Sequence, residues 1–249
     1  KNYFYPDLPK GYQISQYEHP LVQGGYLDIG EGKTIRITRV HLEEDTGRII
    51  HDRDHSSALI DFNRAGVPLM ELVTEPALRS GDEVRRFGEA LQRIVRYVGA
   101  SDANMEKGEM RVEVNISLRK KGIETFGTKV EVKNINSFKF AADAVDYEIK
   151  RQSEILDGGG VIKQETRGWN EFKKHTFSQR SKEAAHDYRY FPEPDLPPLN
   201  LSREFVEELR IGLPELPEAK RKRFVGQYVL DPDIAEILVR EKATADYFE

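Results

Sequence analysis

The chain has no cysteine among its 249 residues, which excludes a disulfide framework and a thiolate zinc site. It also has no apolar run of about 18 residues, the length that a membrane-spanning helix needs, so we expect no membrane segment. An excess of positive charge is missing too. The formal net charge is −5, so any contact with RNA has to come from a local patch. The composition is 38% hydrophobic and 33% charged, which indicates a soluble protein with much solvated surface.

Neither end of the chain carries a terminal signal. The opening KNYFYPDLPK is polar and aromatic and lacks an initiator Met, so we expect no signal peptide there. The last residues, KATADYFE, stop without a helix-capping signal. We therefore expect both ends to be cut from a longer chain.

Hydrophobic periodicity predicts the strands and helices of the chain. Alternating residues predict strands over 34–42, over two short runs within 58–76, over 110–119 and over 129–135. Helical spacing predicts one helix that Ser80 caps and that Gly99 ends, and a second from Ser137 to the glycines at 158–160. The proline cluster at 192–198 is the best boundary candidate, and helical patterns follow it. We predict an α+β domain over residues 1–200 and the start of an all-α domain over residues 201–249.

The polar faces of the strands at 110–119 and 129–135 are the first candidate site. If the two strands form a hairpin that turns near residue 122, Glu113 faces Glu131 and Arg111 faces Lys133. Like charges directly opposite one another cost up to ~1 kcal/mol per pair. The pairing is easier to understand if a divalent cation lies between the carboxylates and a polyanion binds the cations. The alternative is the solvated face that antiparallel sheets commonly have.

Two charged runs leave similar alternatives open. The acidic run that begins at His41 and includes Glu43, Glu44 and Asp45 suits metal binding or catalysis, and it also suits a solvated turn before Gly47. The basic run over residues 220–223 is either an RNA contact or a solvated helix face. The arginines of the first helix have the same ambiguity; they are Arg85, Arg86, Arg93 and Arg96.

Several long motifs together resemble one family. They are KNYFYPDLPKGYQISQY, HLEEDTGR, DFNRAGVPLMELVTEP, SDANMEKGEMRVEVNIS, GTKVEVKNINSF, QETRGWNE and AHDYRYFPEPDLPPL. In this order they resemble the B subunits of the aspartyl/glutamyl-tRNA amidotransferases, and the resemblance runs through nearly the whole chain. It implies an antiparallel-sheet cradle domain of the glutamine synthetase and guanido kinase type, followed by a helical domain that binds tRNA.

The resemblance also implies a function. Members use ATP and Mg²⁺ to phosphorylate the side-chain carboxylate of Glu-tRNA(Gln) or Asp-tRNA(Asn), and ammonia from glutamine then displaces the phosphate. This is a carbon–nitrogen ligase with glutamine as amido donor. The A subunit supplies the ammonia, and the C subunit fastens the other two together. The implied location is the bacterial cytoplasm or an organellar matrix. The alternatives are a free-standing carboxylate kinase or ligase of the same fold and a non-catalytic tRNA-binding scaffold.

The resemblance also implies roles for single residues, which we assign by matching positions in the motifs. The resemblance implies that Glu44 and Glu131 are ligands of the metal, and that Glu113, which is Asp in many members, is a third. From their place among these residues, we expect Arg111, Lys133 and Arg64 to contact phosphates or the acyl carboxylate. The family's N-terminal segment, whose glutamate and histidine complete the metal site, is not among these residues, and neither are most of the helical domain and the tail domain. We therefore do not expect these 249 residues to catalyse the reaction alone.

Overall fold

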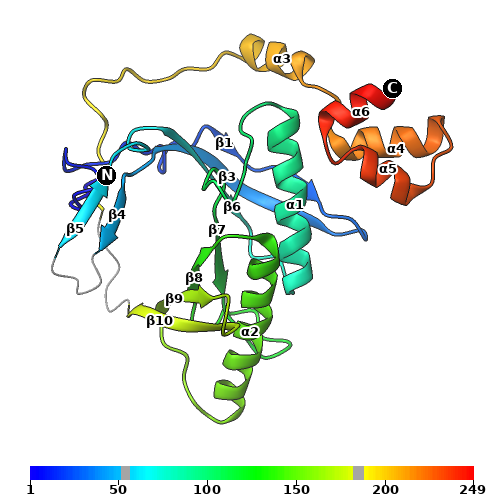
Figure 1. Ribbon diagram of the computed structural model, residues 1–249. Coiled ribbons are helices and arrows are strands. Elements are labelled where there is room, and N and C mark those ends of the chain that lie inside the picture. Colours follow the sequence, from blue (N-terminus) through cyan, green and yellow to red (C-terminus); the bar gives the residue numbers. More distant parts are fainter. Residues whose placement is uncertain (52–56, 182–187) are drawn as a thin grey trace. The chain divides into compact units, whose positions relative to one another are not determined.

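The computed structural model describes residues 1–51, 57–181 and 188–249, and Figure 1 shows its helices and strands. The chain divides into two compact units. The first unit comprises residues 1–27, 34–77 and 184–199, and the second comprises residues 28–33, 78–183 and 200–249. Each unit is described by itself below.

The first unit is built on the long strand β3, Thr34–Glu44. β3 pairs antiparallel with β1, Val22–Gln23, and with β6, Pro68–Thr74; β2, Tyr26–Asp28, joins the same sheet. A separate antiparallel pair is formed by β4, Arg48–His51, and β5, Ala58–Asp61.

The strand expected over 34–42 is therefore confirmed, but it is longer than the alternation suggested. Glu43 and Glu44 were expected to begin an acidic turn. They continue β3 because they pair with Leu69 and Pro68 of β6. This extension places carboxylates on a rigid strand rather than on a loop.

The second unit packs two helices with a sheet in the order β10-β9-β8-β7. The strands are β7, Val112–Ile116; β8, Val130–Ile135; β9, Glu165–Asn170; and β10, His175–Ser181. Helix α1 spans Gly81–Tyr97 and α2 spans Phe138–Asp157. Both helices begin where the sequence predicts, because the side chains of Ser80 and Ser137 accept hydrogen bonds from the backbone amides of Glu83 and Phe140.

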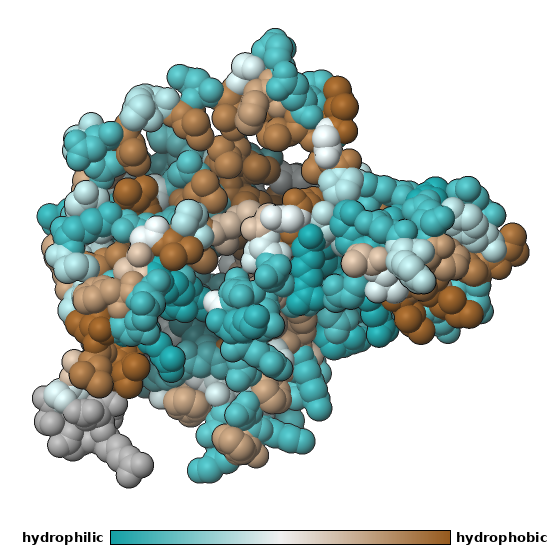
Figure 2. Space-filling view, turned by 45° about the horizontal axis from the view of Figure 1, so that its top comes forward, coloured by the Kyte–Doolittle hydropathy of each residue, from teal (hydrophilic) through white to brown (hydrophobic). Residues whose placement is uncertain are grey.

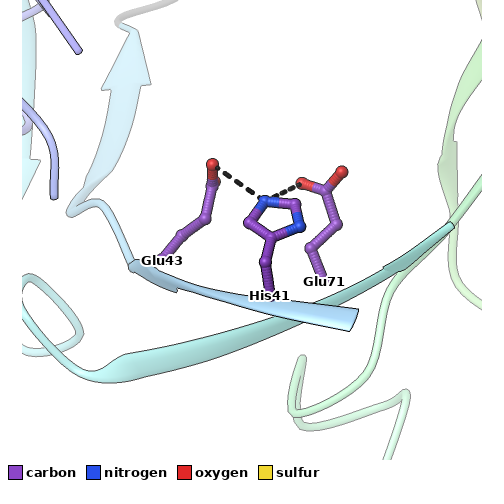
Figure 3. A group of neighbouring side chains, drawn as sticks. All are labelled: His41, Glu43 and Glu71. Atoms are coloured by element: carbon purple, nitrogen blue, oxygen red, sulfur yellow. Dashed lines mark hydrogen bonds and ion pairs between the residues drawn. The ribbon is translucent and has the colours of Figure 1, made fainter. Parts of the chain in front are cut away.

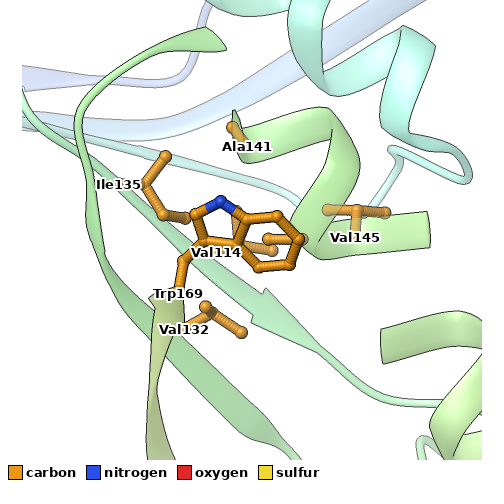
Figure 4. Packing of buried hydrophobic residues seen from close by; sticks show 7 residues of the cluster. Val114, Val132, Ile135, Ala141, Val145 and Trp169 are labelled. Atoms are coloured by element: carbon orange, nitrogen blue, oxygen red, sulfur yellow. The ribbon is translucent and has the colours of Figure 1, made fainter. Parts of the chain in front are cut away.

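The core of the second unit lies between α2 and the sheet. Figure 4 shows Trp169 of β9 among apolar side chains from β7, β8 and α2, including Val114, Val132 and Val145. Alternate residues of β7 and β8 enter this core, which is the pattern of a strand with one covered face. The charged residues between them consequently lie on the opposite face.

One pair in this sheet is parallel, whereas the expected sheet was antiparallel. β8 and β9 run in the same direction, with Glu131 opposite Thr166 and Lys133 opposite Gly168. Parallel neighbours need a long crossover connection, and α2 supplies it. The mixed α and β architecture is confirmed; the likeness to glutamine synthetase stays a prediction.

Residues 200–249 form helices, as expected. They are α3, Arg203–Gly212; α4, Pro217–Gln227; α5, Pro232–Leu238; and α6, Lys242–Phe248. Phe224, Ala235, Val239 and Ala245 form a small core of their own. These residues group with 78–183 in the second unit, and the domain boundary at residue 200 stays a prediction.

Apolar side chains also reach the surface. Figure 2 shows hydrophobic residues in several places on the face turned to the viewer. Helix α3 has no buried residue, and its Leu209 and Ile211 are 55% and 79% exposed. In the described part of the chain, no helix combines the length and the apolar character that crossing a bilayer requires.

Candidate functional site

One acidic group lies on the sheet of the second unit, on the face opposite α2. We call this surface the polar face; it comprises Glu113, Asn115, Glu131, Lys133 and Thr166. Alternation along β7 and β8 puts the first four side chains there, as the sequence predicts. Thr166 comes from β9, a strand that the sequence did not connect with this site.

The register expected for β7 and β8 is wrong. Asn115, rather than Glu113, lies opposite Glu131, and a bulge separates Val112 from Val114. Because the displacement is two residues (115 against 113), the same side chains share the face but meet different partners. Lys133 Nζ lies 3.1 Å from Glu113 Oε1 and 3.6 Å from Glu131 Oε1. Opposite charges therefore replace the expected like-charge pairs, so repulsion between carboxylates no longer calls for a cation here.

Glu131 is the most sheltered carboxylate of the polar face. Its side chain is 14% exposed, against 51% for Glu113. Thr166 Oγ1 donates a hydrogen bond of 2.9 Å to Glu131 Oε2 from the neighbouring strand. Burial acts to lower the pKa of Lys133, but Glu113 and Glu131 outweigh it and raise the pKa above its usual value. Lys133 therefore remains a cation between two carboxylates.

The expected phosphate-binding arginines have different surroundings. Arg111 is exposed and immediately precedes β7, so it does not pair with Lys133 across the strands. Arg64 belongs to the first unit, where its Nε lies 2.9 Å from Asp45 Oδ2. Their roles toward a phosphate stay predictions.

Glu44, the ligand implied by the resemblance, is held by residues near the N-terminus of the chain. Its Oε2 lies 2.6 Å from Lys10 Nζ and accepts a 3.2 Å hydrogen bond from the backbone amide of Ile14. Glu44 belongs to the first unit and Glu131 to the second, so the expected convergence of these two carboxylates stays a prediction.

A second acidic group lies on the other face of β3 from Glu44. It consists of His41 and Glu43 of β3 and Glu71 of β6, whose candidate ligand atoms all lie within 4.8 Å of one another. Figure 3 shows both carboxylates directed toward His41 Nε2, at 3.4 Å for Glu43 and 4.0 Å for Glu71. His41 and Glu71 meet because they are paired residues of β3 and β6.

Neighbouring donors keep Glu43 ionised. Burial acts to raise its pKa, but hydrogen bonds from Ser15 and Lys1 outweigh burial and lower the pKa. Ser15 Oγ lies 2.7 Å and Lys1 Nζ 3.0 Å from Glu43 Oε1. His41 is fully buried, and its Nδ1 has no hydrogen-bond partner in the described part of the chain.

The donor set of this group fits a divalent cation. An imidazole nitrogen and two carboxylate oxygens are common metal ligands, although Mg²⁺ itself prefers oxygen. A metal-binding histidine normally donates its other ring N–H to a second residue, and His41 has no such partner among the described residues. Glu71 was not predicted from the sequence. A single charge within the apolar run PLMELV was the available signal.

The basic run of α4 is already engaged within the second unit. Lys220 is buried, and its Nζ lies 2.5 Å from Asp246 Oδ1. The other members also pair with carboxylates: Arg221 and Lys222 with Glu218, and Arg223 with Glu215 and Glu249. On α1, Arg93 and Arg96 pair with Glu236 and Glu241. These contacts favour a structural role for the basic side chains over an RNA contact.

Comparison with known proteins identifies the class to which this chain belongs. Residues 1–207 match the family described as the GatB/GatE catalytic domain, and the chain belongs to that family.

Relatives along the whole chain bear a more particular name, the B subunit of the aspartyl/glutamyl-tRNA(Asn/Gln) amidotransferase. The chain is 54% identical over 252 residues to the protein of that name from Caldicellulosiruptor saccharolyticus, covering all of the chain and 52% of that protein. Those from Persephonella marina and Coxiella burnetii are 56% and 54% identical; the chain covers 53% of each. It thus spans about half the length of these relatives.

Proposed function

We propose that this chain is the phosphorylating part of a tRNA-dependent amidotransferase. An oxygen of the side-chain carboxylate of Glu-tRNA(Gln) or Asp-tRNA(Asn) attacks the γ-phosphorus of ATP, and ADP leaves. Ammonia then displaces phosphate from the acyl phosphate and leaves the amide. The observation that carries the proposal is family membership along residues 1–207, joined to a sheltered Glu131 beside a protonated Lys133.

The polar face has the groups that this transfer requires. Phosphoryl transfer depends on positioning and charge neutralisation more than on covalent chemistry. Lys133 supplies a fixed positive charge, and Arg111 directly precedes β7, the strand that carries Glu113. In this proposal both contact the phosphates or the acyl carboxylate. Arg64 does so from the first unit.

Carboxylates would hold the Mg²⁺ that accompanies ATP. In the second unit these are Glu131 and Glu113. In the first unit the resemblance implies Glu44, and the group of His41, Glu43 and Glu71 offers a second ligand set. The bound cation neutralises phosphate charge when it is present. Thr166 keeps Glu131 oriented through its hydrogen bond.

The proposal includes partners because the chain spans about half the length of its relatives. The A subunit would release ammonia from glutamine, and the C subunit would join it to the protein that contains this chain. The remaining length of that protein would add contacts with tRNA. The name of the relatives, which describes one component of an amidotransferase for aspartyl- and glutamyl-tRNA, supports this assembly.

The test is Glu131→Gln in the full-length protein assembled with its partner subunits. We expect ATP-dependent amide formation to fall by about 10² or more, the usual cost of losing one electrostatic contact to a transition state. Glutaminase activity should persist, since it needs no phosphoryl transfer. Glu208→Gln, at an exposed position of α3, is the control. Normal amidation in the Glu131→Gln protein removes Glu131 from the site, and amidation without tRNA favours a free-standing kinase or ligase.

A further inference from the structure

Two loops leave the sheet of the second unit at the same end. The first, residues 117–129, joins β7 to β8, and the second, residues 158–164, joins α2 to β9. They share this end because Ile116, Val130 and Glu165 form one row across the three strands. We call the surface of the two loops the basic end. Its cations are Arg119, Lys120, Lys121, Lys129 and Lys163, and its one carboxylate is Glu124.

The five cations of the basic end are available to an external anion. All of them are exposed, and none forms an ion pair with a carboxylate in the part of the chain that the structure describes. The basic run at 220–223 differs, because each of its members pairs with a carboxylate of the second unit. In a chain of net charge −5, unpaired cations that gather at one place are the local patch that an RNA contact requires.

The first loop also presents an aromatic ring. Phe126 is 55% exposed, and Cζ of Arg119 lies over this ring, 4.6 Å from its centroid. The chain closes tightly at the base of the loop, where a Cβ on Gly127 would lie 2.1 Å from the carbonyl oxygen of Leu118. Proteins that bind single-stranded nucleic acid combine exposed rings with cations in this way, because the ring stacks on a base while cations contact the backbone.

A tight turn holds the two lysines at the tip of this loop. The amide of Ile123 donates a 3.1 Å hydrogen bond to the carbonyl oxygen of Lys120, and Gly122 has a φ of +90°. Glycine suits this left-handed position of the turn. Lys120 and Lys121 therefore have an ordered backbone, so less conformational entropy is lost when they contact an anion.

The basic end borders the polar face of the proposed active site. Lys129 precedes Glu131 by two residues, and Thr166, whose hydroxyl donates a hydrogen bond to Glu131, is the second residue of β9. A strand advances about 3.3 Å per residue, so the first loop ends about 7 Å from Glu131 along the chain. In the proposed function the carboxylate that receives the phosphoryl group is attached to RNA. RNA therefore has to approach this face, and cations beside it suit that approach.

We propose that the basic end binds backbone phosphates of the tRNA substrate and that Phe126 stacks on one of its nucleotides. The inference rests on the proposed function, which makes tRNA the substrate. The four lysines supply point charges for phosphate oxygens, and Arg119 supplies a guanidinium beside the ring. An acidic surface of a partner subunit would also attract these cations, but an exposed ring next to an arginine favours a nucleotide.

The test measures binding of deacylated tRNA(Gln) without ATP, using the full-length protein assembled with its partner subunits. Dissociation constants are measured at several salt concentrations between about 50 and 200 mM, the range over which phosphate contacts change affinity strongly. One variant changes Lys120 and Lys121 together to Gln, and a second changes the same two lysines to Arg. A third is Phe126→Ala.

The turn between β9 and β10 supplies matched controls, because it leaves the sheet at the opposite end and carries the same residue types. Phe172 is 88% exposed, and Lys173 and Lys174 are exposed lysines without a carboxylate partner among the described residues. The controls are Phe172→Ala and the joint change of Lys173 and Lys174 to Gln. They repeat the loss of a ring and of two charges away from the basic end.

We expect the Gln variant of Lys120 and Lys121 to reduce the slope of log K against log salt by about 1.4 to 1.8, since each lost phosphate contact removes about 0.7 to 0.9. The Arg variant should keep the slope, because it keeps both charges. Phe126→Ala should weaken binding about tenfold at every salt concentration and leave the slope unchanged, because stacking is not a charge contact. Neither control should change the affinity or the slope by this much.

Three results overturn the proposal. They are an unchanged slope in the Gln variant of the basic end, an equal decrease in the control at 173–174, and an unchanged tRNA affinity joined to weaker assembly with the partner subunits. The last result would assign the basic end to a protein interface. The Glu131→Gln test reports on phosphoryl transfer and this one on RNA binding without turnover, so failure of one is distinguishable from failure of the other.

Discussion

At the scale of single residues, Glu43 and Glu44 show how one step along a strand changes a side chain's chemistry. They are neighbours on β3, yet Glu43 is directed to His41 and Glu44 to Lys10. A strand alternates its faces residue by residue, so the two carboxylates cannot serve the same cation in the same way. Their adjacency makes them a matched pair for an experiment.

Glu43→Gln should weaken binding of Mn²⁺, a spectroscopic substitute for Mg²⁺, by about tenfold or more in the full-length protein, as losses around metal sites commonly do. Glu44→Gln should change it less, because Glu44 is directed to Lys10 and is not part of the group of His41, Glu43 and Glu71. Electron paramagnetic resonance titration measures both affinities without any turnover. The opposite order would assign the cation to Glu44, as the family resemblance implies.

Thr166 gives a second prediction at this scale. Thr166→Val keeps the shape of the side chain but removes the hydrogen bond to Glu131. If this bond orients Glu131 for phosphoryl transfer, kcat for amidation falls about 10- to 100-fold while the KM for tRNA stays unchanged. Thr166→Ser restores the hydroxyl and should recover most of the rate. A Val variant with normal kcat would show that Glu131 needs no such support.

The residue pattern predicted which side chains share a face, but not which ones meet. Glu113, Glu131 and Lys133 were grouped correctly, because alternation alone decides the face of a strand. Their partners were predicted wrongly, because register depends on the bulge after Val112 and on the connection to β8. A slip of two residues preserves the face, so no hydrophobic pattern can reveal it.

At the scale of elements, α1 and α2 were predictable because capping residues in the sequence mark where they begin. Ser80 and Ser137 cap them, and apolar residues recur at helical spacing. Their mutual packing was not predictable. It depends on Gly88, where an added Cβ would overlap the ring of Phe138.

This close approach predicts opposite effects for the same substitution in two helices. Gly88→Ala should destabilise the protein by about 1–3 kcal/mol, because Phe138 has to move. Gly226→Ala in α4 should stabilise it by about 0.5–1 kcal/mol, since nothing lies within 4 Å of the new Cβ and alanine favours helix. Urea unfolding of the full-length protein measures both. Equal effects at the two sites would show that α1 and α2 do not pack closely at Gly88.

Glu148 joins α2 to the sheet and makes that junction sensitive to acid. It is fully buried and accepts hydrogen bonds from Arg151, Gln152 and Thr176. Burial acts to raise its pKa, but these donors outweigh burial and hold the pKa below its ordinary value of 4.5. The unfolded state therefore binds the proton more readily than the folded state does. The stability that Glu148 contributes is complete above pH 4.5 and is lost as the pH falls through the lower, folded-state pKa.

Glu148→Gln should remove the part of the free energy of unfolding that is lost in acid. It should also lower the free energy of unfolding near neutral pH. The expected loss at pH 7 is about 3 kcal/mol, because Arg151 would keep a charge without its buried partner. Glu154→Gln, on the same helix but 67% exposed, should stay within about 0.5 kcal/mol of the parent. Thermal unfolding tests this when it is followed from pH 7 to well below pH 4.5, through the lowered pKa of the folded state. An unchanged pH profile in Glu148→Gln would mean that Glu148 is not the group that titrates.

At the scale of the whole molecule, the sequence predicted the family but not the residues with which the charged side chains pair. Long motifs in collinear order indicated the amidotransferase family, and the match over residues 1–207 confirmed it. The basic run at 220–223 looked like an RNA contact because sequence shows cations but not their partners. Carboxylates from Glu215 to Glu249 surround that run in the fold. The net charge of the 249 residues is −5, so the chain as a whole has no general electrostatic attraction for RNA.

The salt dependence of tRNA binding tests this conclusion. Removing one phosphate contact should reduce the slope of log K against log salt by about 0.7 to 0.9. Neutralising Arg221, Lys222 and Arg223 to Gln together should leave the slope of the full-length protein nearly unchanged, because these cations are held by carboxylates. Glu218→Gln is the complementary variant, since it removes the carboxylate that Arg221 and Lys222 share without removing a cation. A slope that falls by about two in the triple variant would make this run an RNA contact, with its internal ion pairs giving way to phosphates when tRNA binds.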